Sequence, residues 1–486
     1  MFNDQRSTGR PQGAKIGFIA PLRIRVYIIM CRIVGVFFAS LLFFSSALFA
    51  TKPNVIVFFV DDMGYRELSC NDSPDIRTPN IDSLATNGVR CTAGYVSAPI
   101  CGPSRAGLMT GHYQTQFGYE ANPKDQFRDS FGLDLNYQTL GDRMQAAGYK
   151  TGAIGKWDLG RSVAHHPRNR GFDFYYGHII GARNFWPMQK GPEHIVLTRG
   201  PGEKVKETKY LTHQLTDGAL EFLDTYQRDP FFLYVAYNAP HSPFQATDED
   251  LARNSHIENE KRRILAGMIT ALDDGLGAIL EKLRELNQEE ETLIFFVSDN
   301  GSPSGHAPYK EFLGENNLPF SGGKGNLFEG GIRVPFIVQW KGGNLPIGTT
   351  CDTPVSSLDL MPTLLNLTSA DVPSDLPGMD ILPLLTGEST EPRNLYWRFN
   401  GSYAVRSGDW KWVHDAKSDR TQLFNLADDI GEHRDLLKSH PEKASELEAL
   451  WRKWNRQNVA PLWQKPAVQK RLKQIYGGEG MGAVKQ

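Results

Sequence analysis

Neither sign of charge is in excess in this 486-residue chain. It carries 53 Lys and Arg residues against 55 Asp and Glu residues, for a formal net charge of −2. A nucleic-acid-binding surface needs clustered cationic side chains, and this balance gives no case for one. The 22% of charged and 40% of hydrophobic residues are typical of a globular protein. The length is sufficient for a large core or for two domains.

Cysteine is also scarce, and the five cysteines show no spacing of the kind that binds zinc. They are Cys31, Cys70, Cys91, Cys101 and Cys351. Cys31 falls in a targeting segment and Cys101 in a motif described below, so three remain, enough for one disulfide and one free thiol. Spacing does not determine pairing; Cys70 with Cys91 is the pair that we expect.

Long uninterrupted apolar runs are confined to the N-terminus. Arginines up to Arg32 precede the run Ile33–Phe44, and small residues follow it. This pattern predicts that residues 1–50 are a signal peptide, with Met30 as an alternative true start. The second reading is an uncleaved anchor, because residues 33–50 reach the lower limit of roughly 17–20 residues for a bilayer span. We expect cleavage and export to a periplasm or to the exterior, with membrane contact only through this segment.

Three shorter apolar runs have the length of buried parallel strands: Asn54–Val60, Phe231–Ala236 and Leu293–Val297. Polar side chains follow the first and the third run directly. Ligands of open parallel sheets collect at the carboxyl ends of the strands. The two junctions supply an all-oxygen set consisting of Asp61, Asp62, Asp299 and Asn300. Such a set favours one calcium ion, and the absence of clustered histidines at these strand ends argues against zinc.

The segment Cys101–Gly111 combines a cysteine, a predicted helix start and a fixed cation. Pro103 suits a first helical turn and Gly111 suits a helix end. The positive end of a helix dipole favours an anion, and Arg105 adds charge one turn further on. A buried structural cysteine beside a capped helix is the alternative reading. The string C-x-P-S-R followed by T-G, however, resembles the signature of the sulfatase family, in which an enzyme oxidises the cysteine to formylglycine.

Other segments resemble the same family from Pro53 to about Leu437. The matching segments are Thr78–Ala85, Gly155–Gly160, Arg170–Gly177, Asn238–His241, Phe328–Pro335, Ser356–Leu365 and Gln422–Leu426. The resemblance implies an α/β fold like that of alkaline phosphatase: a central mixed, mostly parallel sheet with helices on both faces, plus a small C-terminal antiparallel subdomain. We expect a catalytic domain over residues 51–390 and the subdomain over 391–486, with the tail from Ile475 frayed.

The resemblance also implies a role for each candidate residue. Cys101, as formylglycine, would join the calcium ligands and attack sulfur, and Arg105 would orient it. Lys156 and Lys324 would hold the sulfate oxygens, and His241 would protonate the leaving alcohol. Maturation implies a formylglycine-generating or anaerobic sulfatase-maturating enzyme as a partner.

Asp158 departs from the family pattern, which has histidine in the element G-K-W-H-L-G. By its position the resemblance makes Asp158 the candidate for the base that is needed when the second hydroxyl of the formylglycine expels sulfate. A carboxylate there faces an anionic ester, and like charges at about 4 Å repel by roughly 1 kcal/mol in water and by more in a dry site. Asp158 therefore turns away, pairs with a cation, or marks a changed substrate or a lost activity.

The predicted function is release of inorganic sulfate from an organic sulfate ester, either an aryl sulfate or, as we expect, a sulfated glycan. Trp186, Trp397 and Tyr403 are candidates for a sugar platform if they are exposed. Two alternatives remain open at this point. One is hydrolysis of phosphonate or phosphate esters by the same kind of site, and the other is a non-catalytic protein that binds sulfated glycans.

Overall fold

The computed structural model describes residues 52–122, 131–188, 190–303, 316–388, 392–478 and 480–482. From Pro53 onward the described residues belong to one compact unit. The predicted signal peptide, residues 1–50, lies outside the described residues. Among the helices that are described, none combines the length and the apolar character that a bilayer crossing requires.

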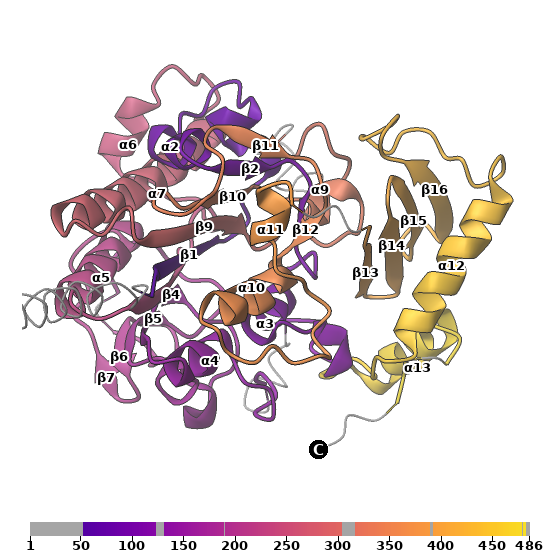
Figure 1. The fold of residues 1–486 in the computed structure, drawn as a ribbon, viewed down its shortest axis with the longest axis horizontal. Coiled ribbons are helices and arrows are strands. Elements are labelled where there is room, and N and C mark those ends of the chain that lie inside the picture. Colours follow the sequence, from indigo (N-terminus) through magenta and orange to yellow (C-terminus); the bar gives the residue numbers. More distant parts are fainter. Residues whose placement is uncertain are drawn as a thin grey trace, which may run out of the picture. The chain divides into compact units, whose positions relative to one another are not determined.

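A ten-stranded sheet forms the centre of this unit (Figure 1). Its strands, in spatial order, are β11 (Thr349–Cys351), β2 (Val89–Cys91), β10 (Phe336–Gln339), β9 (Thr292–Ser298), β1 (Asn54–Val60), β8 (Phe231–Ala236), β4 (Lys150–Lys156), β5 (Phe174–His178), β6 (Thr198–Gly200) and β7 (Glu203–Lys204). The five strands β9, β1, β8, β4 and β5 run parallel to one another. Strand β10 runs antiparallel to both of its neighbours, and β6 and β7 are also antiparallel. The sheet is therefore mixed and mostly parallel, as predicted.

The central strands are buried on both faces because helices cover both. All residues of β1, β8 and β9 are buried, which is why the sequence shows unbroken apolar runs there. One hydrophobic core lies between the sheet and the helices α3 (Cys101–Thr110), α4 (Leu140–Ala146), α10 (Leu360–Leu367) and α11 (Leu382–Leu385). The other lies beneath α2 (Pro79–Thr86), α5 (Leu211–Thr225), α6 (Asp248–Arg253) and α7 (Glu260–Glu285).

The predicted antiparallel subdomain is present as a four-stranded meander. Its strands are β13 (Asn394–Phe399), β14 (Ser402–Ser407), β15 (Trp410–Asp415) and β16 (Arg420–Asn425), and α12 (Pro441–Asn455) packs on β14 and β15. A short helix of the main domain, α9 (Glu329–Ile332), supplies Ile332 to the core that the meander shares with residues near β3 (Gly94–Tyr95). The other short strand, β12 (Val355–Ser356), pairs with β3.

Several local expectations are wrong. The chain beyond Ile475 is not frayed at Tyr476, which is buried at the end of a helix that we did not predict, α13 (Pro466–Ile475); its hydroxyl accepts a hydrogen bond from the Gly401 amide. Trp397 is 2% exposed, so it belongs to the core rather than to a sugar platform. Tyr403 is half-buried and stacks on His414. Only Trp186 of the three is exposed, at 43%.

The expected disulfide is also absent. Cys70, Cys91, Cys101 and Cys351 are all free thiols. The backbone amide of Cys70 donates to Asp82, whereas Cys91 lies opposite Cys351 in the pairing of β2 with β11. The spacing of the cysteines did not indicate this neighbour, because Cys91 and Cys351 are far apart in the sequence and come together only through the pairing of β2 with β11.

Candidate active site

The carboxyl ends of the parallel strands bring four predicted oxygen ligands to one edge of the sheet. Asp61 and Asp62 follow β1, and Asp299 and Asn300 follow β9, its direct neighbour. The Asp62 backbone amide donates to Asp299 Oδ1 at 3.2 Å, and Asn300 Nδ2 donates to Asp62 Oδ1 at 2.7 Å. All four side chains are buried. Parallel register therefore joins residues that lie some 240 positions apart in the sequence.

Three cations lie against these carboxylates, of which Lys156 and Arg105 are buried and Lys324 is partly exposed. Lys156 Nζ lies 2.7 Å from Asp61 Oδ2, and Lys324 Nζ lies 2.6 Å from Asp62 Oδ1. Arg105 donates two hydrogen bonds to Asp299 Oδ2, from Nε at 3.0 Å and from Nη2 at 2.7 Å. Burial opposes the charged forms, but the facing carboxylates outweigh it and raise the pKa of each cation above its usual value.

Some of the oxygen atoms at this edge have no protein partner. Asp61 Oδ1 and Asn300 Oδ1 are buried and accept no hydrogen bond from the part of the chain that the structure describes. Asp61, Asp62 and His241 each offer one ligand atom within 4.8 Å of the others. Burial raises the pKa of Asp61, whereas at Asp62 Lys324 and His241 overcome burial and lower the pKa to about 2. Buried polar atoms are rarely left unsatisfied, so these oxygens suit a hard cation.

Cys101 is the first residue of α3, as the sequence analysis expected, and its thiol is buried. Asn122 Nδ2 donates to Cys101 Sγ at 3.1 Å, and Asn122 Oδ1 accepts from the Gly102 amide at 3.2 Å. Burial raises the pKa of the thiol to about 11, against the opposing effect of Lys156 and Lys324. At neutral pH the side chain is therefore a protonated thiol, which is a weak nucleophile.

His241 reaches the same edge from the loop after β8. Its Nε2 lies 3.6 Å from Asp62 Oδ2, and its Nδ1 is 2.6 Å from the Ser242 carbonyl oxygen. Because a carbonyl only accepts, Nδ1 carries the proton and Nε2 faces the site. Burial and the charge of Lys324 lower the pKa of His241 to about 4.

Asp158 also lies in the site, two residues beyond Lys156 at the end of β4. Its carboxylate is buried, and Oδ2 lies 3.9 Å from Lys156 Nζ without a hydrogen bond. Of the three possibilities raised by the sequence, turning away is thus excluded. The carboxylate stays beside a cation, at a longer separation than the Lys156–Asp61 pair.

Sequence reasoning missed three residues that hold the site together. Asn122 contacts the Cys101 thiol, as described above. The Tyr234 hydroxyl accepts from Arg105 Nη1 at 3.1 Å, and the Tyr119 hydroxyl donates to the Asp158 carbonyl oxygen at 2.8 Å. Tyr234 lies inside the apolar strand β8, and its hydroxyl group, unusual in such a strand, could have indicated a polar contact. No sequence motif surrounds Asn122 or Tyr119 that could have indicated their roles.

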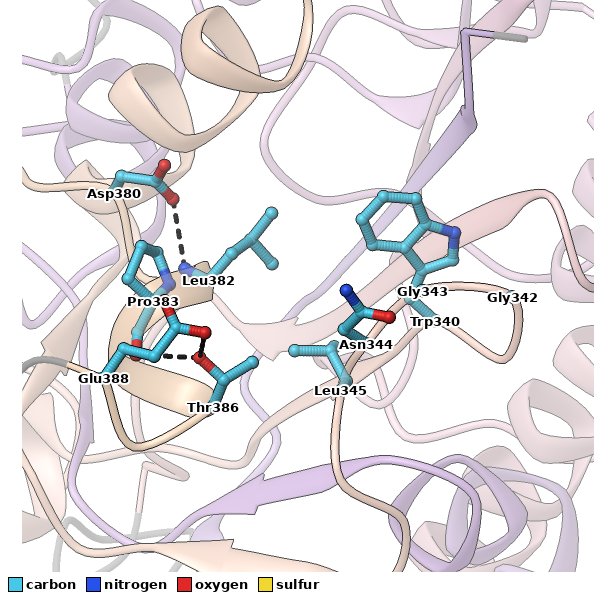
Figure 2. Close-up of a pocket in the computed structure, with 10 residues that line it drawn as sticks. All are labelled: Trp340, Gly342, Gly343, Asn344, Leu345, Asp380, Leu382, Pro383, Thr386 and Glu388. Atoms are coloured by element: carbon cyan, nitrogen blue, oxygen red, sulfur yellow. Dashed lines mark hydrogen bonds between the residues drawn. The ribbon is translucent and has the colours of Figure 1, made fainter. Parts of the chain in front are cut away.

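A separate, partly apolar cavity lies away from this site. It has a volume of about 390 Å³ and is lined by Trp340, Leu345, Leu382 and their neighbours (Figure 2). Trp340 follows β10, which runs antiparallel to β9, so the cavity lies toward the opposite edge of the sheet. Its two carboxylates already accept hydrogen bonds, Asp380 from the Leu382 amide and Glu388 from the Thr386 hydroxyl. The cavity therefore lacks the convergent polar groups of the site around Cys101.

Comparison with known proteins agrees with this geometry. The profile of the family described as "Sulfatase" matches residues 53–370, and that of "N-sulphoglucosamine sulphohydrolase, C-terminal" matches residues 323–459. The chain is 32% identical to N-acetylgalactosamine-6-sulfatase of Mus musculus, over 74% of this chain and 71% of that protein. It is 32% identical to arylsulfatase A of Bos taurus, over 82% of this chain and 86% of that protein.

A solved structure is similar over nearly its whole length. The crystal structure of Ps i-CgsB in complex with k-i-k-neocarrahexaose superposes with a TM-score of 0.80 and 36% identity, covering 88% of this chain and 98% of that one. Family profile, curated relatives and structure thus agree. The chain belongs to the sulfatase family, as a type I sulfatase of the alkaline-phosphatase superfamily, and is a sulfuric ester hydrolase.

Proposed function

We propose that this sulfatase removes sulfate from a sulfated glycan, with one calcium ion and a formylglycine made from Cys101. Two similarities support the glycan as substrate. One curated relative is named for a sulfated sugar, N-acetylgalactosamine 6-sulfate, and the solved structure at 36% identity holds k-i-k-neocarrahexaose. Export, predicted from residues 1–50, is part of the proposal because it would bring the enzyme to such polysaccharides.

The donor atoms of the site fit a calcium ion. Asp61, Asp62, Asp299 and Asn300 would hold it, and the unpartnered Asp61 Oδ1 and Asn300 Oδ1 are the observation that carries this assignment. Carboxylate and amide oxygens are calcium's usual ligands. When bound, the ion supplies positive charge that lowers the pKa of a coordinated hydroxyl and attracts the ester oxygens.

The surroundings of Cys101 fit its conversion to formylglycine. As a thiol with a pKa raised to about 11, Cys101 is poorly suited to attack an anionic ester directly. The hydrated aldehyde supplies a hydroxyl nucleophile at the same position. The N-terminus of α3 and the amide of Asn122 hold this position in place. A formylglycine-generating or anaerobic sulfatase-maturating enzyme would be the partner that carries out the conversion.

The cations of the chain bind and orient the ester. Lys156 and Lys324 converge on the space beside Cys101, and each lowers the pKa of its thiol by charge. In this position both ammonium groups can donate to sulfate oxygens, which holds the sulfur against residue 101 and disperses the charge that develops during transfer. Arg105 binds Asp299 bidentately and so fixes one ligand of the metal site.

His241 supplies the proton for the leaving alcohol. The Ser242 carbonyl fixes the ring so that Nε2 faces the site. The pKa of about 4 reflects burial and the charge of Lys324. A bound ester anion opposes the effect of Lys324 and raises this pKa, so that His241 gains its proton together with the substrate.

Release of inorganic sulfate tests the proposal. Purified enzyme is incubated with 4-nitrophenyl sulfate and with a panel of sulfated oligosaccharides, and sulfate is measured by ion chromatography. We expect turnover of at least one oligosaccharide, a loss of at least about 10³-fold in Cys101→Ala, and wild-type rates in the control Cys70→Ala. Turnover of aryl sulfate alone would remove the glycan from the proposal, and full activity of Cys101→Ala would refute the mechanism.

A further inference from the structure

The backbone holds Asp158 firmly at the edge of the anion site. Its φ of +59° is a left-handed conformation that Asp and Asn tolerate better than most residues. Its amide donates to the Ile179 carbonyl at 3.1 Å, and its own carbonyl accepts from the Tyr119 hydroxyl at 2.8 Å. Both hydrogen bonds use the main chain, so neither satisfies the carboxylate.

The carboxylate itself is enclosed on one side and unpartnered on the other. A Cβ atom at Gly181 would lie 2.8 Å from Asp158 Oδ1, so the Gly181 backbone closes over that oxygen. The other oxygen, Oδ2, is buried without a hydrogen bond and lies 3.9 Å from Lys156 Nζ. Lys156, the cation beside this oxygen, is one of the two lysines proposed to hold the sulfate oxygens of the ester. Asp158 therefore faces the space that the ester's anionic group would occupy.

The cost of this arrangement depends on the charge of the ligand. An organic sulfate ester carries one negative charge. A phosphate monoester carries up to two, because its second pKa is near 6. Repulsion from a fixed carboxylate grows in proportion to the ligand's charge and is strong in a buried site. A histidine at position 158, as in the family motif, would not repel either ester in this way.

We propose that Asp158 is a specificity-determining residue that disfavours dianionic ligands, so that the enzyme accepts monoanionic sulfate esters and rejects phosphate monoesters. This inference rests on the proposed function of the same site. It predicts in addition that inorganic sulfate, a dianion, is bound weakly, which favours release of the product.

Two variants and a matched control test the inference. Asp158→Asn removes the charge with little change of shape, and Asp158→His restores the family residue; both residue types tolerate a left-handed φ. Asp419→Asn is the control, because Asp419 also has a positive φ, of +53°, and its side chain is 95% exposed. All chains are checked for equal conversion of Cys101 by mass spectrometry.

The first readout is the ratio of kcat/KM for 4-nitrophenyl phosphate to that for 4-nitrophenyl sulfate at pH 8. The second is the Kd of inorganic sulfate by calorimetry, which requires no turnover. We expect Asp158→Asn to raise the ratio and to tighten sulfate binding, each by about tenfold, with Asp158→His moving both in the same direction and Asp419→Asn moving neither.

The outcomes separate the two claims. If the wild type hydrolyses sulfate esters but both Asp158 variants leave the ratio and the sulfate Kd within twofold, the inference is wrong and the proposed function stands. If the converted wild type hydrolyses no sulfate ester, the proposed function fails, and the calorimetric Kd still decides whether Asp158 repels dianions.

A second, independent observation concerns Cys91 and Cys351. They lie directly opposite each other in the parallel pair formed by β2 and β11. Neighbouring strands are about 4.8 Å apart, within the range of Cα separations that a disulfide spans, about 4.4–6.8 Å. Their thiols interact, which raises the pKa of Cys91 and lowers that of Cys351 to about 7. Cys91 is buried, whereas Cys351 is half-buried and lines a cavity of about 670 Å³.

We infer that Cys91 and Cys351 form a disulfide when the chain meets a disulfide oxidant such as oxidised glutathione. The thiolate of Cys351, the more accessible of the two, attacks one sulfur of the oxidant and releases one glutathione thiol. The sulfur of Cys91 then displaces the second glutathione. Two protein thiols lose two electrons and two protons, and the oxidant's disulfide is reduced to two thiols.

Peptide mapping of the full chain tests this second inference. After incubation with oxidised glutathione, a non-reducing tryptic digest should contain Cys91–Arg105 joined to the peptide of residues 342–393. The Cys351→Ser variant should lack this species, and the control Cys70→Ser should retain it. We also expect the cross-link to raise the Tm by a few degrees. Separate peptides, a Cys70–Cys91 link, or glutathione retained on Cys351 would each overturn the inference.

Discussion

Two clusters of charged side chains in this protein have similar composition, but they differ in how far their polar atoms are paired within the chain. The first is the active site around Cys101. The second, which we call the closed cluster, consists of Lys411, Glu329, Glu432, Arg333 and Tyr95, and it joins the main domain to the C-terminal meander. Lys411 Nζ lies 2.8 Å from both Glu329 Oε1 and Glu432 Oε1, and Arg333 with Tyr95 binds the other oxygen of Glu329.

The difference lies in what remains unpaired. In the closed cluster both oxygens of Glu329 accept hydrogen bonds, and Glu432 Oε1, which has no hydrogen bond among the described residues, still lies 2.8 Å from the Lys411 ammonium. In the active site Asp61 Oδ1 and Asn300 Oδ1 have no hydrogen bond among the described residues, and Asp158 Oδ2 has only the Lys156 ammonium at 3.9 Å. Buried charges persist only when they are compensated. The chain itself compensates the closed cluster, which serves the fold, whereas in the proposed function a metal ion and an ester would complete the compensation of the active site.

The largest expected effect on stability comes from breaking the closed cluster. Lys411→Met leaves two buried glutamates with one cation fewer, and we expect a loss of about 3–5 kcal/mol in the free energy of unfolding. The rate of sulfate release per folded molecule should not change. The control is Lys443→Met, a surface ion pair worth less than about 1 kcal/mol. Guanidinium denaturation gives both values, and equal losses in the two variants would contradict the account.

Removing a cation from the active site should show the reverse pattern. We expect Lys324→Ala to lower kcat/KM by about 10²–10³-fold, because an electrostatic contact to the transferred group is lost, with little change in Tm. Lys341→Ala is the control, since Lys341 has similar exposure and pairs only with Glu289. A Lys324→Ala variant with full activity would exclude this lysine from the site.

Metal removal should affect only the cluster with unpaired oxygens. Treatment with a chelator should lower the Tm, and calcium at about 100 times its Kd should restore about 2.7 kcal/mol. Asp61→Ala should abolish the response, whereas Lys411→Met should retain it. Scanning calorimetry measures these Tm values. A wild-type Tm that changes neither on chelation nor on addition of calcium would refute the metal site.

The closed cluster should give the smallest effect, a dependence of stability on pH. Burial and the nearby Glu329 raise the pKa of Glu432 from 4.5 to about 7. Between these values the folded state retains a proton that the unfolded state releases, so stability falls as the pH rises from 4.5 to 7. The slope is at most about 1.4 kcal/mol per pH unit. Glu432→Gln should remove this slope, and denaturation at pH 5, 6 and 7 measures it; an identical slope in both proteins would contradict the assignment.

The sequence predicts well the parts of the protein that depend on local patterns. The unbroken apolar runs gave β1, β8 and β9, and parallel register alone was sufficient to bring Asp61 and Asp299 to one edge. The family resemblance gave the small antiparallel subdomain, which the structure shows as the meander. These features follow from short-range periodicity and from the family resemblance.

What the sequence did not predict depends on contacts between distant segments. Asn122 and Tyr119 support the site from positions without any motif. The partner of Cys91 is fixed by a short edge strand, β11, that carries no apolar pattern. The sequence left open whether Trp397 belongs to a sugar platform or to the core, because it does not show which face of the small sheet the main domain covers. The proposed conversion of Cys101 to formylglycine would be a covalent change made by another enzyme, and only direct observation of residue 101 can establish it.

The mass of the tryptic peptide Cys91–Arg105 tests the account most directly. It should be determined on the same preparation whose rate of sulfate release has been measured. We predict that active protein carries an aldehyde in place of the Cys101 thiol, and that the fraction converted rises in proportion to the rate. A preparation that releases sulfate at full rate while residue 101 remains an unmodified cysteine would contradict the account.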